Sequence, residues 1–111
     1  MDLLEKKCIP CSIGDDPLTK EQVQENLKLL QKEWELVEEK KIRRKFKFPD
    51  FKSALGFVNK VGELAESEGH HPDICFGWGE VAIELMTHKI NGLHENDFIL
   101  AAKIDKLHRE L

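Results

Sequence analysis

Three of the five histidines occur in two short segments that carry the residue types needed for proton transfer. His70 and His71 are adjacent and are followed by Pro72, and His88 follows Thr87 farther along the chain. An imidazole has an unperturbed pKa of about 6.5, so it can give or take a proton near neutral pH. Histidines that gather at the ends of elements, instead of being scattered over helix faces, suggest a proton-transfer site.

Two other interpretations of these histidines are open at the level of sequence. The simplest is that they are polar residues at a helix exit and a strand exit. A metal site would combine two histidines with Asp97 or Glu66. However, residues ahead of a proline are extended and successive side chains point to opposite sides. His70 and His71 could therefore hardly hold one ion at the roughly 2.0–2.1 Å of a zinc–nitrogen bond.

The third interpretation is general acid–base catalysis on a flat heterocycle. For this chemistry it is useful that His70 and His71 point to opposite sides, because one histidine can transfer a proton of the heterocycle while the other orients the heterocycle. Loss of hydroxide from carbon is slow unless the leaving oxygen is protonated and a proton is removed elsewhere, and positioned side chains contribute roughly 10²–10⁴-fold to such steps. Cys75 is not a competing nucleophile, since no base lies at helical or turn spacing from it, and we predict a core thiol.

Length and composition exclude several classes of protein. A chain of 111 residues forms one domain. The net charge of −4 argues against nucleic acid as a partner, because such domains usually carry a basic face. No apolar run approaches the ~20 residues that a membrane span needs, and the start of the chain lacks the apolar core of a signal peptide. We therefore expect a cytoplasmic protein without a membrane partner.

The first residues differ in character from the rest. Residues 1–17 show no periodicity and contain Cys8-Ile-Pro-Cys11. They predict a flexible or loosely docked lead-in, followed by a single domain over 18–111. Cys8 and Cys11 have the spacing of half a zinc knuckle, but no second pair follows nearby, so we interpret them as incidental thiols.

The sequence of the first half of the domain predicts a helix followed by a pair of strands. Thr19 and Gln22 form a capping-box sequence at the start of a helix over about 20–32. Two strands follow at 34–38 and 41–48, with a tight turn near residues 39–40. Basic side chains alternate with apolar ones in the second strand. Because no companion basic patch exists, they indicate a solvated sheet face or a polar pocket rim and not a nucleic-acid surface.

The second half contains the segments that position the histidines. Asp50 is a carboxylate N-cap for a long helix over 51–68, and Gly69 is placed to end it in a left-handed conformation. Glu66 precedes His70 by four residues, so the two could meet on one helix face. A third strand begins at Ile74.

A fourth strand follows over residues 81–88, after a turn at 77–79. Its odd positions face the helices, which places His88 on the face away from the core. A last helix runs from Asn96 to about Leu107, and its small Ala101 and Ala102 would allow close approach of a second subunit.

These elements follow the order helix, two strands, helix, two strands, helix. The pattern predicts an α+β fold with two layers, in which a four-stranded antiparallel sheet has three helices packed on one face. The other face of the sheet must be solvated, form a pocket or pair with another subunit.

The spacing of the polar residues resembles the signature of the pterin-4a-carbinolamine dehydratase family. The matching pattern is Glu66-x3-His70-His71-Pro72, followed by Trp78, His88 and Asp97. The segments 81–88, 91–93 and 101–105 are also similar to the family, so that the resemblance covers about residues 18–108.

The resemblance implies an activity. Family members dehydrate 4a-hydroxytetrahydropterin, the product left by aromatic amino acid hydroxylases, to the quinonoid dihydropterin, without a metal or organic cofactor. Catalytic roles would fall to His70, His71 and His88. The substrate-binding or supporting residues would be Glu66, Pro72, Trp78, Thr87 and Asp97. We expect His70 and His88 to transfer protons at the 4a-hydroxyl and N5, and His71 to position the pterin.

The resemblance also implies partners. Family members are typically dimers of dimers, so we expect a homodimer or homotetramer, with an aromatic amino acid hydroxylase as a pathway partner. Animal relatives also act as dimerisation cofactors of a homeodomain transcription factor. The alternative function is therefore protein binding through the last helix.

Overall fold

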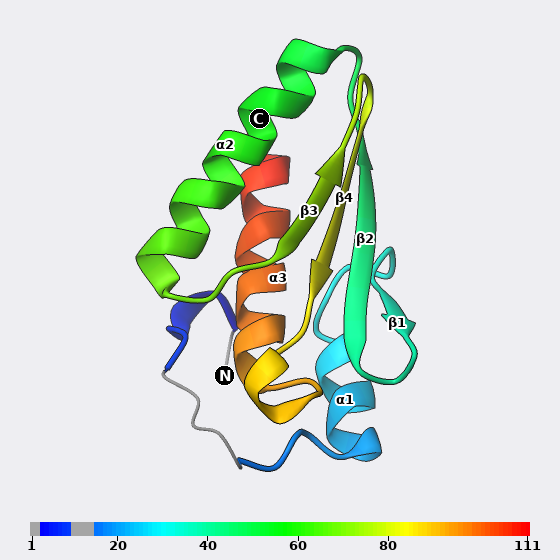
Figure 1. The fold of residues 1–111 in the computed structure, drawn as a ribbon, viewed down its shortest axis with the longest axis vertical. Helices are drawn as coiled ribbons and strands as arrows, with labels where there is room; N and C mark the ends of the chain where they lie inside the picture. The colour runs from blue at the N-terminus through cyan, green and yellow to red at the C-terminus, as the bar shows by residue number, and fades with distance from the viewer. Residues whose placement is uncertain (1–2, 10–14) are drawn as a thin grey trace.

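The predicted fold class is confirmed by the arrangement of helices and strands in the computed structural model, which describes residues 3–9 and 15–111 (Figure 1). A four-stranded antiparallel sheet has the strand order β1-β2-β4-β3. In chain order, the elements are η1 Leu3–Glu5, α1 Lys20–Leu27, β1 Glu35–Val37, β2 Lys41–Lys47, α2 Phe51–Glu68, β3 Asp73–Phe76, β4 Glu80–Leu85, η2 His88–Ile90 and α3 Glu95–Arg109. No helix of the described part is long and apolar enough to cross a membrane.

The core lies between the sheet and the helices α2 and α3. Val81, Ile83 and Leu85 of β4 are fully buried, as the predicted alternation requires. They face fully buried aromatic side chains, among them Phe57 of α2 and Phe98 of α3. This packing fixes both helices on the same face of the sheet, where α2 and α3 lie side by side (Figure 1).

Helix α2 has the predicted bounds and ends. The Asp50 carboxylate accepts a hydrogen bond from the Ser53 N–H at 2.7 Å, which satisfies one of the free donors at the helix start. At the other end Gly69 has φ 68°, the left-handed conformation that glycine adopts without strain. This cap turns the chain away from the helix axis, and residues 70–72 therefore run across toward β3.

Four element boundaries differ from the sequence prediction. The capping box at Thr19 is present, but α1 ends at Leu27 and not near residue 32. The turn between β1 and β2 uses Glu38 and Glu39, both with positive φ, one residue earlier than predicted. Strand β4 ends at Leu85, so His88 belongs to the short helix η2. Helix α3 begins one residue earlier than predicted and is capped by the side chain of the preceding residue, His94.

One prediction about a small side chain is wrong. Cys75 is exposed and is not a core thiol, because it pairs with Ala82 across the outer face of the sheet. Ala101 is fully buried within the chain itself and serves internal packing, whereas contact of the last helix with a second subunit stays a prediction. Ala102 is half-buried beside it.

A buried polar cluster that the sequence did not reveal ties α3 to the sheet. The Trp34 indole N–H donates to both oxygens of Asp105 at 2.9 and 3.0 Å, and Arg44 contacts the same carboxylate at 2.6 Å. Burial raises the pKa of Asp105, while the hydrogen bond from Trp34 and the charge of Arg44 oppose this shift. Because a buried carboxylate needs such partners, α3 is held in one position on the sheet.

The same substitution, glycine to alanine, at two positions of α2 tests the left-handed cap of this helix. Gly69→Ala should lower the free energy of unfolding by about 1 kcal/mol, because alanine is strained in the left-handed region although no atom blocks its Cβ. Gly56→Ala, in the exposed interior of the same helix, should raise it by roughly 0.5–1 kcal/mol. Urea unfolding measures both changes in free energy. Changes of the same sign would contradict the left-handed conformation of Gly69.

The environment of His108 predicts a pH dependence of stability. Burial against Phe46, Phe48 and Phe57, together with the nearby Arg44, lowers the pKa of His108 in the folded state. Below the unfolded value of about 6.5, the unfolded chain therefore binds a proton more readily than the folded chain, and stability falls.

Urea unfolding at pH 7.5 and 5.5 measures this loss. The loss of unfolding free energy on acidification should be smaller in His108→Phe than in the wild type, since the variant lacks the titrating ring. Equal losses in the two proteins would show that His108 does not contribute.

Candidate active site

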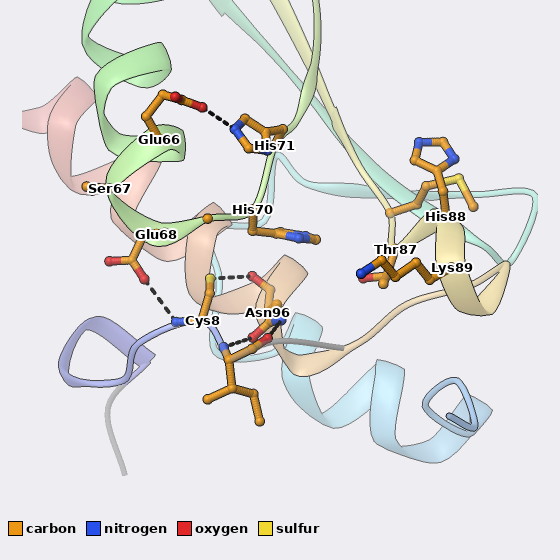
Figure 2. A pocket seen from close by; sticks show the side chains of 13 residues that line it. Cys8, Glu66, Ser67, Glu68, His70, His71, Thr87, His88, Lys89 and Asn96 are labelled. Carbon is orange, nitrogen blue, oxygen red and sulfur yellow. Dashed lines mark hydrogen bonds and ion pairs between the residues drawn. The ribbon is translucent and has the colours of Figure 1, made fainter. Parts of the chain in front are cut away.

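The predicted histidines surround one cavity of about 590 Å³. It lies where the end of α2 and the segment after β4 meet the start of α3 and the lead-in (Figure 2). Its lining comes from Cys8 and Ile9, residues 66–71, residues 86–89 and Asn96. A volume of this size is within the roughly 300–1,000 Å³ range of small-molecule sites.

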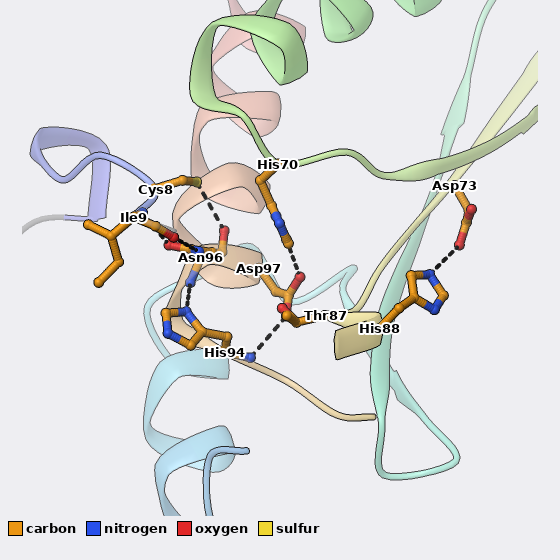
Figure 3. A network of polar contacts seen from close by, with 9 residues as sticks. All are labelled: Cys8, Ile9, His70, Asp73, Thr87, His88, His94, Asn96 and Asp97. Atoms are coloured by element: carbon orange, nitrogen blue, oxygen red, sulfur yellow. Dashed lines mark hydrogen bonds and ion pairs between the residues drawn. The ribbon is translucent and has the colours of Figure 1, made fainter. Parts of the chain in front are cut away.

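His70 is the most firmly held of the three histidines. Its Nε2 lies 2.6 Å from Oδ1 of Asp97, and its side chain is 13% exposed. Asp97 is completely buried, and its other oxygen accepts hydrogen bonds from the Thr87 hydroxyl and the His94 main-chain N–H, both at 2.9 Å (Figure 3). An ionised carboxylate only accepts hydrogen bonds, so Nε2 of His70 donates to Asp97, and in the neutral form of the ring Nδ1 keeps its lone pair.

His71 has a different carboxylate partner. It pairs with Glu66, and both side chains are largely exposed (Figure 2). The predicted contact between Glu66 and His70 is therefore wrong. The left-handed turn at Gly69 ends the helix before His70, so the four-residue spacing no longer places two side chains on one face.

His88 lies at the start of η2, after the end of β4. Its Nε2 is 3.6 Å from Oδ2 of Asp73, and both side chains are about 70% exposed (Figure 3). Asp73 was not among the predicted site residues, although it directly follows Pro72 in the sequence. Each of the three histidines thus has its own carboxylate partner.

The structure brings together most, but not all, of the predicted site residues. Glu66 and Thr87 line the cavity with the histidines, and Asp97 lies behind His70. Pro72 connects His71 to β3 without lining the cavity. Trp78 is 70% exposed in the turn between β3 and β4, at the opposite end of β4 from the histidines, so within one chain it does not reach the site.

Sequence reasoning missed the contribution of the lead-in. The part that the structure describes begins with the buried Leu3, and Cys8 and Ile9 line the cavity. Cys11, and with it the complete Cys-x-x-Cys motif, lies outside the described residues. The division of the chain at residue 18 stays a prediction.

Among residues 3–9 and 15–111, no three His, Cys, Asp or Glu side chains are grouped so that they could hold a metal ion. The carboxylates next to the histidines are instead engaged with imidazole, hydroxyl and main-chain N–H groups. The arrangement places three imidazoles, each beside a carboxylate, around one cavity. Such groups can give and take protons.

The chain is similar to known proteins over most of its length. The family model for pterin 4 alpha carbinolamine dehydratase matches residues 16–107. A relative assigned to these dehydratases from Alkaliphilus metalliredigens is 50% identical over 109 residues, 98% of this chain and 98% of the relative. Another, from Methylococcus capsulatus, is 54% identical over 97% of this chain and 95% of its own length.

A solved structure is also similar. The crystal structure of a transcriptional coactivator/pterin dehydratase from Brucella melitensis has a TM-score of 0.77 and 34% identity, over 83% of this chain and 98% of that chain. Both the sequence and the fold are therefore shared over nearly the whole length of the relatives. This chain belongs to the pterin-4-alpha-carbinolamine dehydratase family.

Proposed function

We propose that this protein dehydrates 4a-hydroxytetrahydropterin to quinonoid dihydropterin by histidine general acid–base catalysis. The observation that carries the proposal is that His70 and His88, from separate elements, line one cavity and have separate carboxylate partners. The names of the relatives and the size of the cavity support the same substrate class.

The reaction needs one proton delivered and one removed. The bond between C4a and the hydroxyl oxygen breaks, and the hydroxyl leaves as water after it takes a proton. N5 loses its proton, and its electron pair forms the double bond to C4a. The reaction is therefore a net loss of water, with no oxidation or reduction, and two positioned proton carriers suffice.

His70 is the better candidate for the base. Asp97 accepts the hydrogen of Nε2, so Nδ1 is the nitrogen that is free to take the N5 proton. The imidazolium that forms lies beside a fully buried carboxylate, which stabilises the new positive charge. Thr87 and the His94 main-chain N–H hold that carboxylate in place.

His88 is the candidate for the acid. Its side chain is 71% exposed at the rim of the cavity, so it can be protonated again from solvent after each turnover. Asp73 lies close enough to orient the ring. His71, paired with Glu66 on the opposite wall, would orient the pterin, and Pro72 keeps His71 extended.

Cellular context and assembly belong to the proposal as well. The substrate would come from an aromatic amino acid hydroxylase in the cytoplasm, and the protein would act as a homodimer or homotetramer. Trp78 would meet a substrate only across a subunit contact, because within one chain it lies away from the cavity. The alternative, a protein-binding cofactor of a transcription regulator, would not need three paired histidines around a cavity.

Alanine substitutions separate the roles of the histidines. His70→Ala and His88→Ala should lower kcat by roughly 10²–10⁴-fold, because each removes a proton carrier. His71→Ala should mainly raise KM. The assay follows the ultraviolet band of the carbinolamine with each purified variant.

His94→Asn is the matched control, since His94 does not line the cavity and asparagine also caps helices. Its kcat should match that of the wild type. A large loss of kcat only at His71 would reverse the assignment, and a wild type without activity would favour the protein-binding alternative.

Asp97→Asn tests the orientation of His70. The amide can offer its N–H₂ group to the ring, which favours the tautomer with the hydrogen on Nδ1 and removes the lone pair that the base needs. We expect a loss of kcat of about 10²-fold or more, with little change in KM. ¹⁵N spectra of the His70 ring should change from an Nε2–H to an Nδ1–H pattern, and unchanged spectra and kcat would contradict the proposed role.

A further inference from the structure

The segment Lys6–Ile9, called the wall below, contributes Cys8 and Ile9 to the lining of the cavity, although it precedes the residues 16–107 that the family model matches. Cys8 and Ile9 line the cavity, with Cys8 on the side of His70, and the segment runs alongside the start of α3 (Figure 2). This wall comes from the part of the chain that was expected to be flexible or loosely docked.

The wall is attached through a buried side chain. Asn96 is 2% exposed, and both the oxygen and the nitrogen of its carboxamide form hydrogen bonds with the main chain of Ile9 (Figure 3). The Ile9 N–H donates to Oδ1 at 3.0 Å, and Nδ2 donates to the Ile9 carbonyl at 2.6 Å. The segment thus satisfies both the donor and the acceptor of the carboxamide that it covers.

Two further contacts join the wall to the helix ends that carry the site. Glu68, at the end of α2, accepts hydrogen bonds from the Cys8 N–H at 2.9 Å and from Lys103 at 2.7 Å. Lys6 pairs with Glu95, at the start of α3, at 2.6 Å. The same two helix ends hold His70 and its partner, so the wall and the histidine share one support.

The thiol in the wall is not a nucleophile. Burial is the main cause, and the negative charge of Glu68 the second, that raises the pKa of Cys8 to about 12. The thiol therefore stays protonated near neutral pH. Its Sγ lies 3.6 Å from the Asn96 carbonyl oxygen, to which it donates. Cys8 therefore offers surface for contact and no covalent chemistry.

We propose that Lys6–Ile9 is a substrate-binding wall that holds the pterin ring in the cavity and takes no part in proton transfer. The proposal rests on the proposed function, because it takes the ligand to be a pterin. A flat ring is bound tightly when protein surface covers most of it. Release of the wall should therefore weaken binding and leave the histidines able to react.

The test variant is Ile9→Pro in the full chain, which removes the N–H that Asn96 accepts. Binding is measured with biopterin, a pterin that does not undergo the reaction, through the change in its fluorescence. We expect the Kd for biopterin and the KM for the carbinolamine to rise about tenfold, with kcat within twofold of wild type. Lys20→Pro is the control, since proline is tolerated at the first position of α1.

A second measurement needs no substitution. Bound biopterin should slow hydrogen exchange of the Cys8 and Ile9 main-chain N–H groups about tenfold, while the main-chain N–H of the exposed Cys75 on the outer sheet face exchanges at its original rate. Three results would overturn the proposal: an unchanged exchange rate at Cys8, an unchanged Kd in Ile9→Pro, or a loss of kcat without a change in Kd. Binding of biopterin by a wild type without dehydratase activity would instead contradict the proposed function alone.

Discussion

The buried carboxylate of Asp97 is the interaction on which the rest of the site depends. A charge in the interior is tolerated only when hydrogen-bond donors surround it. Here the donors come from the exit of α2, from the segment after β4 and from the residue that caps α3. Because all three must meet at one group, the carboxylate fixes three separate parts of the chain relative to each other.

The three histidines differ in how firmly the protein holds them. His70 is mostly buried and pairs with a fully buried partner, so its ring has one orientation. His71 and His88 are mostly exposed, and so are their carboxylate partners. Exposed ion pairs contribute only about 0–1 kcal/mol, so the ligand itself must supply much of the order at these two positions. One fixed group and two adjustable ones suit a site that must admit a ring from solvent.

Local sequence signals predicted the scaffold well. The cap at Asp50, the apolar spacing of α2 and the glycine at residue 69 together set both ends of that helix, and alternation set the inner face of β4. These features depend on neighbours in the sequence, which is why they can be derived from it. The turn between β1 and β2 was predicted one residue too late, because Glu38 and Glu39 adopt the left-handed conformation without a favoured turn sequence.

The partners of the histidines could not be derived in the same way. The choice of Asp97 for His70, and of Asp73 for His88, depends on how α2, α3 and the sheet edges meet in space. The same holds for the docked lead-in, because nothing in residues 6–9 alone indicates that Asn96 will bind their main chain. Periodicity identifies the elements, whereas a contact between distant side chains requires the tertiary structure.

The central claim is that imidazoles from two separate segments face one bound pterin. The most direct test follows the Cε1–H signals of all five histidines by NMR while biopterin is added. Signals of His70, His71 and His88 should shift and saturate at the same ligand concentration, while those of His94 and His108, outside the cavity, should stay in place. A shift at His70 without one at His88, or no shift at either, would contradict the account.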